Sequence, residues 1–155
     1  METDYIPVIK QKPKTTGKIY PSCEYILHFD GSSKGNPGPA GLGAVIYKNN
    51  DEIWGAAKYL GDYKTNNQSE YSALIYGLKQ AIELGIEELL VFGDSQLVIN
   101  QMNQIYKVKN IVLLELYNEA YQLTKQFKYI EFIHVYRDKN TRADELSNIA
   151  LTLRP

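Results

Sequence analysis

The chain has 155 residues, with 17 basic and 18 acidic side chains and a formal net charge of -1. A single domain of this length can bury a core without disulfide bonds, and the single cysteine, Cys23, excludes an internal disulfide framework and is typical of a reducing compartment. The charge balance argues against a broad basic surface that grips nucleic acid by charge alone. No apolar run approaches the roughly 20 residues of a membrane span, and residues 1–18 lack the apolar block of a signal peptide. The sequence therefore predicts an intracellular protein.

Residues 1–22 differ from the rest of the chain. They contain four lysines and three prolines and show no clear periodicity. This composition favours a flexible tail, with an arm that contacts nucleic acid as the alternative. We therefore place one folded domain at residues 23–155.

The folded part opens with strands. Apolar runs predict strands at residues 24–30, 40–48 and 52–60. Residues 28–47 read as a strand, a tight glycine-rich turn and a second strand. The composition of KNND at residues 48–51 predicts a hairpin turn. The second and third strands should therefore be antiparallel neighbours.

A helix follows these strands, and Gly85 is suited to cap its end. Its apolar residues recur at the spacing of one helical face. These residues are Tyr71, Leu74, Ile75, Leu78 and Ile82. The next segment, residues 88–94, is a short apolar run typical of a buried strand.

Two helical stretches follow, at residues 95–106 and 111–127, with an interruption between them. A strand at 129–136 and a helix at 141–153 close the chain. The order βββαβααβα predicts an α/β fold with a five-stranded mixed sheet, its first three strands antiparallel and helices on both faces.

Four acidic residues occupy comparable places in this order. Asp30 and Asp94 end predicted strands, and Glu70 and Asp144 lie in the first turns of predicted helices. Functional groups gather in α/β sheets where strands end and helices begin, so these carboxylates could meet in one place. Glu70 also falls one turn before Leu74 on the apolar stripe, which directs it toward the core.

Three of these acids also have structural explanations. Glu70 could complete a capping box begun by Asn67, and Asp144 one begun by Thr141. Asp144 could also simply favour the helix dipole. Asp94 could cap the helix that it precedes. For these three the structural and functional interpretations stay open.

Asp30 has no comparable explanation, because it is in phase with Ile26 and His28 on one face of a strand. Burying an unpaired charge there costs several kcal/mol. A divalent cation is a better partner than lysine or arginine, which the strand ends lack, and Mg²⁺ is held by a few carboxylates. Four acids suit two ions about 3.5–4 Å apart, an arrangement that stabilises both the attacking and the leaving oxygen in phosphoryl transfer.

Other kinds of site are not supported. One cysteine and two histidines, His28 and His134, are too few for a zinc site of the Cys/His type, and we predict that both histidines line the core. The sequence has no GxSxG elbow and no P-loop, and the glycines of GNPGPAGLG lead into a strand rather than a helix.

Polar and basic residues flank each acid. Amides and hydroxyls suit sugar hydroxyls and base edges, and cations suit phosphates. The residues are Ser32, Ser33, Lys34, Asn36, Lys64, Thr65, Asn66, Asn67, Gln68, Ser95, Gln96, Arg137, Lys139, Asn140 and Arg142. Such residues are also common in ordinary turns, but their repetition beside every acid favours a nucleic-acid surface.

Four segments of the chain resemble the motif blocks of the type 1 ribonucleases H, in the same order. They are FDGSSKGNPGPAGLGAVI, TNNQSEYSALIYGLKQA, VFGDSQLVINQM and RDKNTRADELSNIA. The resemblance extends from about Tyr25 to Leu151. It implies hydrolysis of the RNA strand of RNA/DNA hybrids by two metal ions, Mg²⁺ or Mn²⁺, leaving 5′-phosphate and 3′-hydroxyl ends.

The resemblance also implies roles for individual residues. It places the metal ligands on Asp30, Glu70, Asp94 and Asp144. It places hybrid contacts on Asn36, Asn66, Asn67 and Gln68, beside Gly31 and Ser32, and a DNA-phosphate contact on Thr65. We expect a monomer that binds RNA/DNA hybrid and no membrane.

The chain departs from the family in two places. Many members carry a histidine in the loop before the last acid; here VYRDKNTRAD has none, and Arg137 is the nearest candidate to replace it. Some members have a basic, tryptophan-rich helical protrusion after the third acid, but the single tryptophan here, Trp54, lies elsewhere. The chain resembles the short branch without this protrusion.

Two other functions are compatible with the fold. A binding module would hold nucleic acid without cutting it, although such a protein would not need all four acids. A DNA nuclease or strand transferase of the same fold would cut DNA instead, usually with additional targeting domains. A hybrid-specific ribonuclease is the favoured interpretation.

Overall fold

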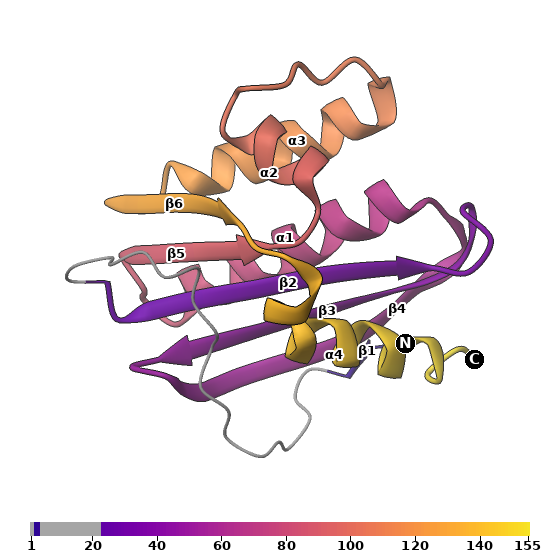
Figure 1. Ribbon diagram of the computed structural model, residues 1–155, viewed down its shortest axis with the longest axis horizontal. Coiled ribbons are helices and arrows are strands. Elements are labelled where there is room, and N and C mark those ends of the chain that lie inside the picture. The colour runs from indigo at the N-terminus through magenta and orange to yellow at the C-terminus, as the bar shows by residue number, and fades with distance from the viewer. Residues whose placement is uncertain (1, 4–22) are drawn as a thin grey trace.

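The computed structural model describes residues 2–3 and 23–155, and a six-stranded sheet lies at its centre (Figure 1). The order of the strands across the sheet is β1-β4-β3-β2-β5-β6. The strands are β1 (Glu2–Thr3), β2 (Tyr25–Ser33), β3 (Gly38–Lys48), β4 (Asp51–Lys64), β5 (Glu88–Gly93) and β6 (Tyr129–His134).

The mixed sheet has the predicted pairing. β2, β3 and β4 are antiparallel neighbours, and β5 and β6 run parallel to β2. Between β3 and β4, Asn49 and Asn50 have φ of 50° and 71°, the left-handed region that a two-residue hairpin needs and that asparagine tolerates. The short sixth strand, β1, pairs with β4 and was not predicted, because two residues carry no periodicity. The rest of the predicted tail at residues 1–22 lies outside the described residues.

The observed ends of β2 and β5 differ from the predicted ones. β2 continues to Ser33 instead of ending at Asp30, because its ladder with β3 extends that far. Its parallel pairing with β5 stops earlier, at Phe29 and Gly93. Asp30 therefore lies just beyond the point where the parallel neighbour ends, beside the loop that begins with Asp94.

Four α-helices and one 3₁₀ helix complete the described part of the fold. They are α1 (Asn66–Glu83), α2 (Gln96–Met102), α3 (Ile111–Thr124), η1 (Arg137–Lys139) and α4 (Thr141–Leu151). α1 packs on β2 and β3 with α3 against it, while α4 packs on the opposite face, over β2, β3 and β4 (Figure 1). The predicted helices on both faces are thus confirmed. None of the described helices is long and apolar enough to cross a membrane.

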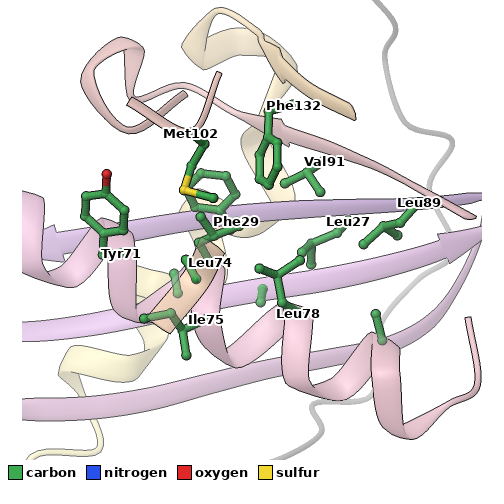
Figure 2. Packing of buried hydrophobic residues seen from close by; sticks show 14 of the residues in the cluster. Leu27, Phe29, Tyr71, Leu74, Ile75, Leu78, Leu89, Val91, Met102 and Phe132 are labelled. Carbon is green, nitrogen blue, oxygen red and sulfur yellow. The ribbon is translucent and has the colours of Figure 1, made fainter. Parts of the chain in front are cut away.

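The alternation of β2 separates the two faces of the sheet. Leu27 and Phe29 are fully buried on the face covered by α1, where they pack in one cluster with Leu74 and Leu78 (Figure 2). Burial of side chains of this size contributes about 1.5–3 kcal/mol each. The intervening His28 points to the other face, toward α4, and Asp30 shares its phase.

Candidate active site

The four predicted metal ligands line one cavity of about 560 Å³. Asp30 comes from β2, Glu70 from α1, Asp94 from the residue after β5, and Asp144 from the first turn of α4. Carboxylate oxygens of Asp30, Glu70 and Asp94 lie within 4.8 Å of one another. Asp144 lies at the same cavity but outside that group of three.

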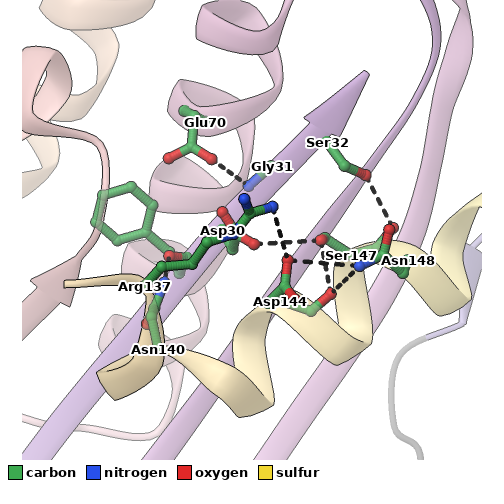
Figure 3. A network of polar contacts seen from close by, with 10 residues as sticks. Asp30, Gly31, Ser32, Glu70, Arg137, Asn140, Asp144, Ser147 and Asn148 are labelled. Carbon is green, nitrogen blue, oxygen red and sulfur yellow. Dashed lines mark hydrogen bonds and ion pairs between the residues drawn. The ribbon is translucent and has the colours of Figure 1, made fainter. Parts of the chain in front are cut away.

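Glycine at position 31 brings β2 against α1. A Cβ atom there would lie 2.3 Å from the carbonyl carbon of Ser69, so no other residue fits without a shift of the backbone. The backbone N–H of Gly31 donates a hydrogen bond of 2.6 Å to Oε1 of Glu70 (Figure 3). This contact fixes one carboxylate oxygen of Glu70 beside Asp30.

A second glycine brings α4 to the other side of Asp30. Gly43 is the partner of Asp30 across the β2–β3 ladder, and a Cβ atom there would lie 2.3 Å from the carbonyl oxygen of Ala143. The hydroxyl of Ser147 on α4 lies 3.4 Å from Oδ2 of Asp30 and 2.9 Å from the carbonyl oxygen of Asp144 (Figure 3). Sequence reasoning missed Ser147, which carries no charge and sits in a helical pattern.

The capping role considered for Glu70 is wrong. The capping box of α1 consists of Thr65 and Gln68, because Thr65 Oγ1 accepts from the Gln68 N–H and the Gln68 side chain accepts from the Thr65 N–H. The helix begins at Asn66, earlier than predicted, so Glu70 lies in its second turn. The carboxylate of Glu70 therefore does not cap the helix.

The capping roles considered for the other two acids are also wrong. Ser95 caps α2, accepting from the Val98 N–H, so Asp94 precedes the cap. At α4 the N-cap residue is Asn140 rather than Thr141, and no side chain caps this end of the helix. The capping explanations for these two acids therefore do not apply, whereas Asp144 does lie in the first turn of α4, where an acid favours the helix dipole.

The electrostatics of the site disfavour three negative charges. Burial raises the pKa of Asp30 above its ordinary value, and the nearby carboxylates of Glu70 and Asp94 raise it further. Burial likewise raises the pKa of Glu70 and of Asp94. Oε2 of Glu70 is buried and has no hydrogen-bond partner among the described residues. A cation bound among these carboxylates would favour their ionised form.

The donor set fits a hard divalent cation. All the candidate ligands are carboxylate oxygens, which Mg²⁺ and Mn²⁺ prefer. The unsatisfied Oε2 of Glu70 and the close approach of three carboxylates are what a metal ion would resolve.

Arg137 is a cation at the edge of this cavity. Its Nη2 lies 3.9 Å from Oδ1 of Asp144, and its side chain is 83% exposed (Figure 3). The neighbouring guanidinium also acts to lower the pKa of Asp94, against the effect of burial. The arginine therefore places a positive charge at the rim of the acidic cavity.

The residues predicted to contact substrate fall in two cavities. Gly31, Ser32, Asn66 and Asn67 line the acidic cavity. A second cavity, of about 350 Å³, shares Asn67 and is also lined by Asn36, Thr65, Gln68, Asn110, Val112 and Leu113.

Some of these side chains also hold the local backbone. Oδ1 of Asn36 accepts from the N–H of Asn66 at 2.9 Å, which ties the β2–β3 turn to the start of α1. Thr65 and Gln68 form the capping box described above. Asn110, missed by sequence reasoning, caps α3 through Oδ1 at the rim of the second cavity.

The two histidines have different surroundings. His28 is 3% exposed, as predicted for a core residue. The same prediction for His134 is wrong, because His134 lines the acidic cavity with Tyr136 and Asn148. The signal was its position at the end of β6, paired with Gly93 and thus next to Asp94.

Comparison with known proteins places this chain and its fold in one family. The family model described as "Reverse transcriptase-like" matches residues 28–150. The ribonuclease HI of Halobacterium salinarum is 35% identical over 149 residues, covering 96% of this chain and 71% of that protein. The chain belongs to the ribonuclease H family, and its motifs are those of type 1.

Two further similarities extend this result. The bifunctional protein Rv2228c of Mycobacterium tuberculosis is 43% identical over 127 residues, which are 81% of this chain and 35% of that protein. The chain thus spans about a third of the length of that relative. The structure of LC11-RNase H1 in complex with RNA/DNA hybrid matches with a TM-score of 0.78 and 36% identity, covering 83% of this chain and 97% of that one.

Proposed function

We propose that this protein is a ribonuclease H, an endonuclease that hydrolyses the RNA strand of RNA/DNA hybrids. The observation that carries the proposal is the group of three carboxylates, from Asp30, Glu70 and Asp94, within 4.8 Å of one another in an open cavity. Relatives named ribonuclease H and a similar structure in complex with RNA/DNA hybrid support this substrate.

Asp30, Glu70, Asp94 and Asp144 hold two divalent cations, Mg²⁺ or Mn²⁺. When bound, these ions supply the positive charge that stabilises the attacking and leaving oxygens of phosphodiester hydrolysis. The reaction adds water across the bond between phosphorus and the 3′ oxygen. The water oxygen joins the phosphorus to give a 5′-phosphate, and the 3′ oxygen leaves with a proton as a 3′-hydroxyl.

The protein's own part is to position charge. The Gly31 N–H orients Glu70, and the rigid ladder of β2 with β3 holds Asp30, so the carboxylates need not rearrange when substrate arrives. Arg137 offsets phosphate charge at the rim, and because its guanidinium stays protonated, it does not transfer protons.

Substrate recognition uses the amides and backbone around the two cavities. Asn36, Asn66, Asn67 and Gln68, with Gly31 and Ser32, contact the minor groove, where a 2′-hydroxyl distinguishes RNA from DNA. Thr65 binds a phosphate of the DNA strand at the second cavity. These contacts read shape and sugar rather than sequence. The protein acts as a monomer within the cell.

A cleavage assay with hybrid, duplex RNA and duplex DNA of one sequence tests the proposal. We expect Mg²⁺-dependent cleavage of the RNA strand of the hybrid alone, and loss of cleavage with chelator or in Asp94→Asn. Cleavage of duplex DNA would instead identify a DNA nuclease. Hybrid binding without cleavage, in the presence of Mg²⁺ or Mn²⁺, would identify a binding module.

A further inference from the structure

We propose that the buried pair of His28 and Asn140 is a positioning device that sets Asp144 relative to Asp30. The inference rests on the proposed function, because it concerns how that metal site is assembled. Neither residue touches the reacting atoms. Their role is to hold the start of α4 against β2.

The pair joins two segments that are distant in sequence. Nδ1 of His28 lies 3.0 Å from Oδ1 of Asn140, across 112 positions. Nδ2 of the same amide donates a hydrogen bond of 2.9 Å to the backbone carbonyl of Phe29. His28 and Asn140 are 3% and 1% exposed, so these hydrogen bonds do not compete with water. The buried amide of Asn140 therefore forms hydrogen bonds with both a side chain and the backbone of β2.

The hydrogen-bond pattern fixes the state of the imidazole. The Asn140 amide donates through Nδ2 to Phe29, so its Oδ1 must accept, and Nδ1 of His28 carries the proton. Nε2 of His28 is buried with no hydrogen-bond partner among the described residues.

The imidazole ring is also packed in place. It makes edge-to-face contacts with Tyr47 and Phe92, at centroid distances of 5.6 and 5.0 Å. The ring is held by these contacts and points its one N–H at Asn140.

Both ends of this pair are close to metal ligands along the chain. Phe29 directly precedes Asp30, and the carbonyl of Asn140 accepts the N–H of Asp144 at 3.1 Å. Asn140 is the N-cap residue of α4, yet its side chain makes no capping bond. The side chain forms hydrogen bonds with β2 instead. The backbone carbonyl of Asn140 accepts the first hydrogen bond of α4, so the position of Asn140 sets the position of the first turn.

Asp144 depends on this support more than the other ligands do. It lies outside the group of three close carboxylates, and its side chain is 33% exposed. A small displacement of the start of α4 would move Asp144 away while leaving Asp30, Glu70 and Asp94 together. Loss of the pair should therefore weaken metal binding and turnover without removing the site.

The test uses His28→Phe, which keeps an aromatic ring between Tyr47 and Phe92 but removes the donor, and Asn140→Ala. Tyr71→Phe is the matched control, because it removes the donor of another buried side-chain hydrogen bond, to Gln101. Two quantities are measured for each variant: the rise in melting temperature caused by Mg²⁺ without substrate, and kcat and KM for hybrid cleavage.

We expect His28→Phe and Asn140→Ala to lower kcat at least tenfold with KM within about twofold, and to reduce the Mg²⁺-induced rise in melting temperature by half or more. The double variant should show no larger decrease in kcat or in the Mg²⁺-induced rise in melting temperature than Asn140→Ala alone. Tyr71→Phe should lower the metal-free melting temperature by about as much as His28→Phe does. It should keep the wild-type kcat and the wild-type rise in melting temperature with Mg²⁺.

The proposal is overturned if His28→Phe behaves like Tyr71→Phe in both measurements. If Asn140→Ala fails to fold, His28→Phe decides the question alone. A wild-type chain that responds to Mg²⁺ but does not cleave hybrid would overturn the proposed function only, because the Mg²⁺ response still tests the pair. A wild-type chain with no response to Mg²⁺ or Mn²⁺ would overturn both.

Discussion

Gly31 and Glu70 are in direct contact although 39 positions separate them, and the Gly31 N–H donates to Glu70 Oε1 at 2.6 Å. The absence of a side chain at position 31 allows this, since a Cβ atom would lie 2.4 Å from the backbone nitrogen of Glu70. The contact joins the strand that carries one ligand to the helix that carries the next.

Gly31→Ala should therefore destabilise the protein and separate Asp30 from Glu70. The clash is with backbone, which cannot turn aside, so we expect a loss of about 1–3 kcal/mol in the free energy of unfolding and at least a tenfold loss of cleavage. Urea unfolding and hybrid cleavage measure the two effects. Wild-type stability and turnover in this variant would contradict the close approach of β2 and α1.

Asp30→Asn should abolish cleavage and leave the fold intact. Burial and neighbouring carboxylates raise the pKa of Asp30, so the ionised group destabilises the metal-free fold at neutral pH. Removing its charge should keep or raise the melting temperature without metal, while Mg²⁺ should stabilise the variant less than the wild type. Near-normal turnover in saturating Mg²⁺ would refute Asp30 as a ligand.

The contribution of His28 to stability should fall at acid pH. Burial lowers the pKa of His28 to about 4, below the value of about 6.5 expected in the unfolded chain. The unfolded state therefore binds this proton first, and the contribution is fully present above pH 6.5 and lost as pH falls toward 4. Its size is about 3 kcal/mol, from 1.36 kcal/mol per pKa unit.

Urea unfolding of wild type and His28→Phe, without metal, between pH 4 and 7 measures this contribution. The variant retains the carboxylates, so the difference between the two curves isolates His28. The stability of the wild type should drop relative to that of the variant as pH falls. A difference that is constant with pH would show that His28 does not titrate in this way.

Arg137→Ala should slow turnover by less than the loss of any metal ligand. The Arg137 side chain is 83% exposed and 3.9 Å from Asp144, which suits an electrostatic contact with phosphate. Because arginine stays protonated, the ratio of wild-type to variant rates should be constant between about pH 6 and pH 9. A change in the shape of the pH–rate profile would assign Arg137 a different role.

Asn66→Ala should weaken hybrid binding by about 1–2 kcal/mol, the scale of a lost polar contact, with little dependence on sequence. Affinity for hybrid and for an all-DNA duplex at two salt concentrations measures this. Asn118→Ala, on the exposed face of α3, is the control. The salt effect should be moderate, because a chain of net charge -1 neutralises few phosphates. Equal loss of affinity for both duplexes would exclude a hybrid-specific contact.

The sequence was sufficient for the five long strands, the helices and the selection of four acids that line one cavity. Periodicity records which face of an element is buried, so the strands and helices were found with errors mainly at their ends. A charge in phase with His28 on a buried strand face is costly, and this cost by itself made Asp30 a candidate ligand. The amide side chains beside the acids were candidates for substrate contacts because amides can donate and accept hydrogen bonds with sugars and bases.

Tertiary structure alone decided how these residues are held. Caps are set by local backbone geometry that composition does not specify, so Thr65 and Gln68 form the box that was considered for Asn67 and Glu70. The prediction of His134 as a core residue is wrong because strand periodicity indicates the face of the sheet on which a residue lies but not what covers that face. The contact between His28 and Asn140 spans 112 positions, and no local pattern encodes it, because a hydrogen bond between distant segments depends on how the sheet and α4 pack.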